Sequence, residues 1–243
     1  MATQNFAAHR ARLFKPGSGS QAAIPYDPAD MYVEFDDFYR FDAGAASTAD
    51  RGDWVATAAT AGTAEIIDGA GGILEIDSNS TTQGQGMNVQ RIHEAFKPAA
   101  GKDIYFEARW KVTDTIGEIQ MFVGLSVLDT TIMASNVISS ANYIGLLCEG
   151  DGQGDVTLST ESGGSQTKEA DVFRMVEDTY FTAGFVVAGT SSVQALHNGV
   201  PVGDEITTNI PTTELAPSFV CVTDGNSIDP IISLDWYVCA QLR

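Results

Sequence analysis

The feature that most constrains the fold of this chain is a succession of short β-type runs with hardly any helical segment between them. In the run 104–112, Ile104, Phe106, Ala108 and Trp110 alternate with polar residues, as in a strand that has one buried face. Similar runs are 73–76, 119–127, 143–148, 181–187, 192–196, 219–222 and 232–239. Only 93–97 and 171–176 have a pattern compatible with a short helix. Many strands and almost no helix predict an all-β sandwich or barrel.

One hairpin can be placed from its turn. Asn198-Gly199 separates the run 193–196 from Val200-Pro-Val202, and this dipeptide favours the two-residue type I′ turn, in which both residues have positive φ. Pro201 has no N–H to donate to a neighbouring strand. The second strand of this hairpin is therefore predicted at the edge of a sheet.

The N-terminal segment differs in charge from the rest of the chain. The first 26 residues hold three of the 13 basic residues and none of the 32 acidic ones. They also contain a Lys-Pro-Gly-Ser-Gly-Ser stretch at 15–20 and lack apolar periodicity, which predicts an extended arm over 1–30 that docks on a partner. The arm residues expected to make this contact are Phe6, Arg10, Arg12, Phe14 and Lys15. Residues 31–243 are expected to form one domain.

The overall charge limits the partners of this domain. A formal net charge of −19 repels nucleic acid and anionic lipid, so we expect neither as a partner. The first 26 residues lack the apolar region of a signal peptide, and no run approaches the roughly 18 to 20 apolar residues of a membrane span. Cys148, Cys221 and Cys239 lie in apolar runs without CxxC spacing, which predicts buried free thiols.

The order of several short motifs resembles the concanavalin A-like lectin/laminin-G jelly roll over about residues 31 to 241. These motifs are Phe35-Asp-Asp-Phe38, Gly52-Asp-Trp54, Gly71-Gly-Ile-Leu-Glu-Ile76, Glu107-Ala-Arg-Trp110, Asn198-Gly199 and Leu234-Asp-Trp-Tyr-Val238. The resemblance implies a two-sheet antiparallel jelly-roll sandwich. Together with the Met-Ala-Thr start and the arm, it makes the chain similar to structural proteins of tailed bacteriophages, in which such jelly rolls serve as head decoration or tail-associated modules.

The sequence carries only part of the catalytic motif of glycoside hydrolases with this fold. Glycoside hydrolases with this fold commonly carry a Glu-x-Asp-x-x-Glu motif on one strand, one carboxylate acting as nucleophile and one as acid. The nearest match places Glu75 and Asp77 on one strand face, but Ser80 stands where the second Glu is required. His9, His93 and His197 have no metal-ligand spacing and no neighbouring nucleophile motif. We therefore expect no enzymatic activity.

Two loops concentrate oxygen donors of the kind that calcium prefers, and calcium is the one cofactor that the sequence suggests. The candidate ligands are Asp151 and Asp155 in one loop and Asp224 and Asp229 in the other. Ordinary turn formation is the alternative role, because Asp and Asn are common turn residues. Trp110 and Trp236 share the alternation of core-type neighbours and are predicted in the core, with a sugar-stacking platform as the alternative.

These features together predict a non-enzymatic structural virion protein. The expected role is that of a capsid decoration or cement protein, attached to the phage head through its arm, with the major capsid protein or another virion protein as partner. A homo-oligomer on the particle and localisation in the virion are expected with it. The alternative is a carbohydrate-binding or receptor-binding module of a phage tail or fibre, with a glycan as ligand.

Overall fold

The computed structural model describes residues 30–44, 52–113, 117–134, 137–150, 153–225 and 229–243, and these residues form strands, turns and loops. The predicted arm contacts Phe6, Arg10, Arg12, Phe14 and Lys15 lie outside these ranges, as does the calcium candidate Asp151. The described residues contain no helix of the length and hydrophobicity needed to cross a membrane.

The first of two large sheets, here called sheet 1, gathers strands from both halves of the chain. Its strands are β1 (Met31–Asp36), β4 (Thr63–Ile67), β5 (Ile73–Asp77), β7 (Ile104–Thr113), β14 (Phe181–Ala188), β15 (Ser192–His197), β16 (Val200–Ile206) and β18 (Ile231–Leu242). They are arranged in the order β16-β15-β14-β7-β18-β5-β4, and β1 is a further neighbour of β18. One side of β18 pairs along its length with β7, while its other side pairs first with β5 and then with β1.

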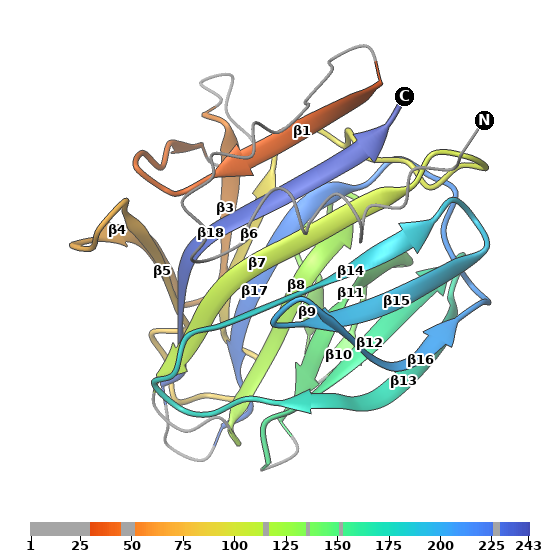
Figure 1. Ribbon diagram of the computed structural model, residues 1–243. Coiled ribbons are helices and arrows are strands. Elements are labelled where there is room, and N and C mark those ends of the chain that lie inside the picture. Colours follow the sequence, from red (N-terminus) through yellow and green to blue (C-terminus); the bar gives the residue numbers. More distant parts are fainter. Residues whose placement is uncertain (1–29, 45–51, 114–116, 135–136, 151–152, 226–228) are drawn as a thin grey trace.

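The second sheet, sheet 2, lies behind sheet 1 in Figure 1. Its strands are β2 (Ala43–Gly44), β3 (Trp54–Ala59), β6 (Gly86–Arg91), β8 (Ile119–Ser126), β11 (Asn142–Glu149), β12 (Asp155–Ser162), β13 (Ser165–Arg174) and β17 (Ala216–Thr223). The order is β13-β12-β11-β8-β17-β6-β3-β2, and every pair is antiparallel except β2 with β3. The predicted all-β, two-sheet antiparallel sandwich is thus confirmed.

The main core fills the space between the two sheets, because alternate residues of each strand face inward. On β7, Phe106 and Trp110 are fully buried, as the alternation predicts, and Phe106 stacks on Phe185 of β14 with ring centroids 5.0 Å apart. Trp54 of sheet 2 packs edge-on against Tyr237 of sheet 1 at 5.6 Å. These aromatic contacts join the layers.

The two segments with a helix-compatible pattern are not helical. Residues 93–97 form a loop, held by a bridge between Phe96 and Leu215, and residues 171–174 belong to β13. The reason is tertiary: Phe173 pairs with Val156 of β12 and joins the core.

A β-bulge in β18 overturns the prediction for one tryptophan. Leu234 and Trp236 flank a break in the register with β7, so Asp235 is an extra residue and the alternation reverses after it. Tyr237 therefore faces the core, and Trp236 lies half-buried among apolar residues on the outer face of sheet 1. The predicted core position is confirmed for Trp110 and wrong for Trp236.

The outer face of sheet 2 is covered by residues 127–134 and 137–140. These residues include the antiparallel pair β9 (Met133–Ala134) and β10 (Val137–Ile138). Asn88 and Gln90 of β6 donate hydrogen bonds from their amides to the carbonyls of Asp129 at 2.7 Å and Val127 at 3.2 Å. A second apolar cluster lies on this face and comprises Phe122, Ile132, Met133, Ile138, Tyr143, Leu147, Val220 and Val222. The central part of this face is therefore occupied by the chain itself.

Candidate ligand-binding site

The candidate site lies where the strands β1 and β18 pair. In their antiparallel register Tyr32 stands opposite Gln241, although the two residues are 209 positions apart. The Tyr32 Oη atom lies within hydrogen-bonding distance of Gln241 Oε1 and 2.6 Å from the carbonyl oxygen of Ala95. A phenol has one proton, so Tyr32 donates to one of these acceptors at a time.

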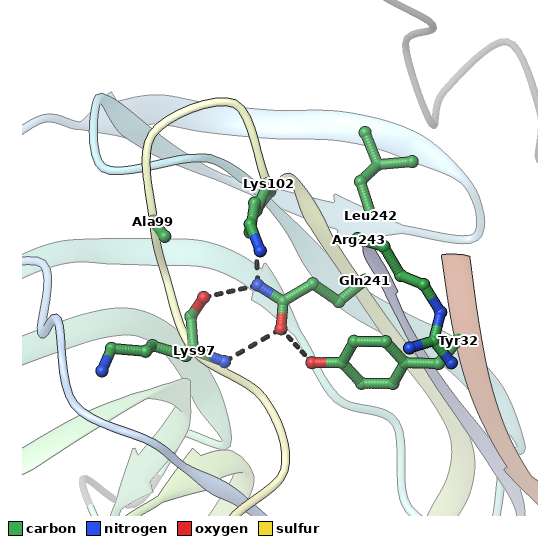
Figure 2. Close-up of a pocket in the computed structure, with 7 residues that line it drawn as sticks. All are labelled: Tyr32, Lys97, Ala99, Lys102, Gln241, Leu242 and Arg243. Atoms are coloured by element: carbon green, nitrogen blue, oxygen red, sulfur yellow. Dashed lines mark hydrogen bonds between the residues drawn. The ribbon is translucent and has the colours of Figure 1, made fainter. Parts of the chain in front are cut away.

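The Gln241 side chain anchors the loop 95–102 to β18 (Figure 2). It is 2% exposed, and its Oε1 accepts the backbone N–H of Lys97 at 2.9 Å. Its Nε2 donates to the carbonyl of Lys97 and, at 3.4 Å, to that of Lys102. A buried amide with its donors and its acceptor engaged gives the site a rigid polar floor.

Two backbone contacts position the rim of the site. The Lys102 N–H donates to the Ala99 carbonyl at 2.9 Å, closing a turn in which Gly101 has a φ of 75°. The Arg243 N–H donates to the Asp30 carbonyl at 2.8 Å. The backbones of Lys102 and Arg243 are thereby fixed, while both side chains are exposed.

Between this loop and β18 lies a cavity of about 250 Å³. It is lined by Tyr32, Lys97, Ala99, Lys102, Gln241, Leu242 and Arg243. The Tyr32 ring stacks on Phe96 at 5.3 Å, and the Arg243 guanidinium carbon lies 5.5 Å from the centre of the same ring. Burial raises the pKa of Tyr32 to about 12, and the positive charge of Arg243 opposes this shift. At neutral pH the phenol is therefore a hydrogen-bond donor.

The positive charges of the protein are distributed unevenly with respect to this cavity. Of the nine Lys and Arg residues in the described part of the chain, seven lie within salt-bridge distance of a carboxylate. These seven are Arg40, Arg91, Lys97, Arg109, Lys111, Lys168 and Arg174. The two that make no such pair with any described residue are Lys102 and Arg243, and both line the cavity. The Lys97 side chain points away from Gln241 in Figure 2, and its ammonium group pairs with Glu214 at 2.8 Å.

The predicted calcium ligands lie in separate surroundings. Arg174 binds both carboxylate oxygens of Asp155, at 2.6 and 2.7 Å, which lowers the pKa of that acid. Asp224 accepts hydrogen bonds from the amides of Gln83 at 3.1 Å and Gln120 at 2.7 Å. Among the described residues, no group of three or more His, Cys, Asp or Glu side chains comes together in a way that could hold a metal ion.

The fourth calcium candidate, Asp229, meets Asp77 of the nearest match to the hydrolase motif. Its Oδ1 accepts hydrogen bonds from Ser78 Oγ at 2.5 Å and from the Ser80 N–H at 3.0 Å. Partial burial, with the carboxylate of Asp229 as a further cause, raises the pKa of Asp77 to about 6. Ser80, which replaces the second Glu of that motif, thus helps to hold Asp229 in place.

Sequence reasoning did not find Tyr32, Gln241, Lys102 or Arg243 as site residues. None of them belongs to a motif, and Tyr32 and Gln241 meet only through the pairing of β1 with β18. The one local signal in the sequence is Gly101, because glycine favours tight turns, and in the structure its φ is positive at the turn before Lys102.

The comparisons with known proteins concern the fold. No protein-family model matches this sequence, and no curated protein does. A solved protein of unknown function from Shewanella oneidensis MR-1 is 12% identical, with a TM-score of 0.60 over 94% of this chain and 97% of that one. A Bacillus licheniformis beta-glucanase is 11% identical, with a TM-score of 0.58 over 86% and 97%. The carbohydrate recognition domain of Emp47p is 11% identical, with a TM-score of 0.56 over 88% and 98%.

These similarities define the class of fold. The chain is a concanavalin A-like jelly roll, the fold shared by lectin and glucanase structures. Identities this low establish the fold alone, because one fold hosts many functions.

Proposed function

We propose that this protein is a non-catalytic carbohydrate-binding module, and that the cavity between the loop 95–102 and β18 is its binding site. The observation that carries the proposal is the rigid floor formed by Gln241, which holds the cavity open between exposed polar side chains. A preformed concave site with a few fixed polar groups is typical of small-ligand recognition. The likeness to a carbohydrate recognition domain supports a sugar as the ligand class.

The volume of the cavity limits the size of the ligand that it can hold. At about 250 Å³ it is smaller than the roughly 300 to 1,000 Å³ typical of drug-sized ligands, so it suits a single sugar unit at the end of a glycan. The central outer face of sheet 2, by contrast, is covered by residues 127–134 and 137–140, whose apolar side chains pack on it, which argues against a polysaccharide site there.

A binding role without catalysis agrees with the state of the carboxylates. The pKa of Asp77 is raised by burial and by its neighbour Asp229, but Asp229 is bound by Ser78 and Ser80. These contacts hold the end of β5 to the start of β18 and give the pair a structural role.

The experiment is calorimetric titration of the full chain with a panel of mono- and oligosaccharides. Ala99→Trp places a large side chain in the cavity without removing a polar contact, whereas Ala100→Trp, at an exposed neighbouring position outside the cavity lining, is the matched control. We expect Ala99→Trp to abolish binding and Ala100→Trp to retain it. If no sugar binds, or if both variants bind equally, the proposal fails.

A second candidate function is decoration of a phage head or tail, in which this domain would be a virion component bound to a capsid or tail protein. The observation that favours it is the contrast between the acid-free residues 1–26, with Arg10, Arg12 and Lys15, and residues 27–243, which hold all 32 acids. Such segments bind by folding on a partner. Deletion of residues 1–26 should then abolish co-sedimentation with the particle and leave the thermal unfolding of the domain unchanged. Equal co-sedimentation of the truncated and full chains would contradict this role.

A further inference from the structure

We propose that the cavity beside Tyr32 binds a sugar that carries a carboxylate, such as a uronic or sialic acid at the end of an otherwise neutral glycan. This inference rests on the proposed carbohydrate-binding function and names the chemical class of its ligand. It follows from the placement of Lys102 and Arg243 on the rim of a small cavity with a fixed floor.

Lys102 and Arg243 differ from the other described basic residues in having no carboxylate partner among the described residues. Acidic residues outnumber basic ones by 32 to 13, so a basic side chain readily finds a carboxylate partner, and seven of the nine described basic residues have one. Lys102 and Arg243 have none among the described residues, and they share one cavity. A ligand with a carboxylate would give these two cations the kind of partner that the other described basic residues already have.

The acids near Lys102 and Arg243 do not pair with them through their side chains. Asp103 follows Lys102, but its carboxylate accepts a hydrogen bond from the Gly189 backbone amide, and burial raises its pKa. Asp30 contacts Arg243 through its backbone carbonyl. Glu214 pairs with Lys97, whose side chain points away from Gln241 in Figure 2. Asp103 and Glu214 are thus engaged elsewhere, and Asp30 meets Arg243 through its backbone, so no side-chain carboxylate of a described residue pairs with either cation.

The chemistry of the two cations suits a carboxylate. A guanidinium presents paired N–H donors that match the two oxygens of a carboxylate, and an ammonium adds a point charge. Arg243 lies over the Tyr32 ring, which limits the range of positions of its guanidinium. This pair suits one planar carboxylate at the cavity mouth, with the sugar ring inside.

The net negative charge of the protein limits how many acidic groups its ligand can carry. A protein of net charge −19 repels a long polyanion. A single acidic sugar on a neutral glycan meets the two cations locally and adds little repulsion, because charges beyond about 8 Å are screened at physiological ionic strength.

The test compares matched ligands on the full chain: glucuronate against glucose, and sialyllactose against lactose, by calorimetric titration. We expect the acidic member of at least one pair to bind about tenfold or more tightly than its neutral counterpart, as one charge-assisted hydrogen-bonded contact allows. Acetate, which has the carboxylate without the sugar, should bind at least about tenfold more weakly than that acidic sugar. If acetate binds as tightly as the acidic sugar, the cavity is a simple anion site and the inference is wrong.

The variants Lys102→Gln and Arg243→Gln should each lower the affinity for the acidic sugar by about tenfold more than they lower the affinity for the neutral one. Arg40→Gln removes the same charge at an exposed position that pairs with Asp42, outside the cavity lining, and is the matched control. Neither Lys102 nor Arg243 makes a salt bridge with a described residue, so Lys102→Gln should keep the melting temperature of the parent, and Arg243→Gln, which loses its contact with the Tyr32 ring, should lower it only slightly.

The outcomes separate this inference from the function on which it rests. Equal binding of neutral and acidic sugars, abolished by Ala99→Trp, would overturn the inference and leave the carbohydrate-binding function standing. Preferential binding of the acidic sugar that survives Lys102→Gln and Arg243→Gln would also overturn it, since the carboxylate would then bind elsewhere. Absence of binding by every sugar would overturn both.

Discussion

Tyr32 of β1 and Gln241 of β18 stand directly opposite each other, and both side chains bind the backbone of the loop 95–102. Three segments that are far apart in the sequence therefore meet at one amide group. The candidate site exists only when β1 and β18 have paired, because neither the floor nor the rim of the cavity is local to one segment.

Replacing Gln241 by Leu should destabilise the protein. The substitution leaves the N–H and the carbonyl of Lys97 without their partner, and unpaired buried polar groups cost about 1 to 3 kcal/mol each. We expect the free energy of unfolding in urea to fall by about 2 to 4 kcal/mol. An unchanged free energy of unfolding would mean that Gln241 does not anchor the loop.

Stability should depend on pH through Asp77. Partial burial and Asp229 raise its pKa from 3.8 to about 6 in the folded state, so the folded protein binds the proton more tightly than the unfolded chain. The favourable contribution is fully present below pH 3.8 and is lost as the pH rises through about 6.

Asp77→Asn should therefore raise the free energy of unfolding at pH 7 by about 1 kcal/mol, after allowance for solvent screening of this half-exposed group. The substitution should also weaken the pH dependence of the free energy of unfolding between about pH 4 and 7. Urea unfolding at several pH values measures both effects, and Asp204→Asn, an exposed acid on β16, should leave the pH dependence unchanged. A steeper pH dependence in Asp77→Asn would contradict the assignment.

The turn between β15 and β16 should not tolerate a β-branched residue at Gly199. Asn198 and Gly199 have φ values of 47° and 78°, and His197 pairs with Val200, as the predicted two-residue turn requires. Gly199→Val should lower the free energy of unfolding by about 1 to 2 kcal/mol, because valine resists positive φ. Val200→Thr, at an exposed position of the same hairpin, should cost less than about 0.5 kcal/mol.

All three cysteines should react slowly with a thiol reagent in the native state. Cys148, Cys221 and Cys239 are free and fully buried, and burial raises the pKa of Cys221 and Cys239 well above the ordinary thiol range. The reactive thiolate is therefore scarce and inaccessible. Labelling followed by mass spectrometry should show three modified thiols only after denaturation, and rapid native labelling would contradict this burial.

Local sequence patterns predicted most of the fold, because each strand carries its own alternation. They placed Phe106 and Trp110 in the core and Pro201 on β16, which is the edge strand of sheet 1. They failed at Trp236, since a bulge is a property of the pairing between β18 and β7 and leaves no mark in the alternation of either strand alone.

The candidate site was beyond the reach of the same patterns. Tyr32 and Gln241 carry no motif and meet only across the paired strands. Of the candidate calcium ligands, Asp155 is bound by Arg174, and Asp229 is bound by Ser78 and Ser80. Tertiary contacts decide which partner each acid binds, and the spacing of residues in the sequence does not show these contacts.

The central position of β18 in sheet 1 has a consequence for biosynthesis. Residues 231–242 follow β1, β5 and β7 in the chain and are therefore synthesised after them, yet all three of these strands pair with them. Until β18 is made, β1 lacks its only neighbour in the described sheet, and β7 has one open edge. The nascent chain thus presents unsatisfied strand edges from the synthesis of β1 until that of β18, which favours slow folding and a need for protection from aggregation before the sheet can close.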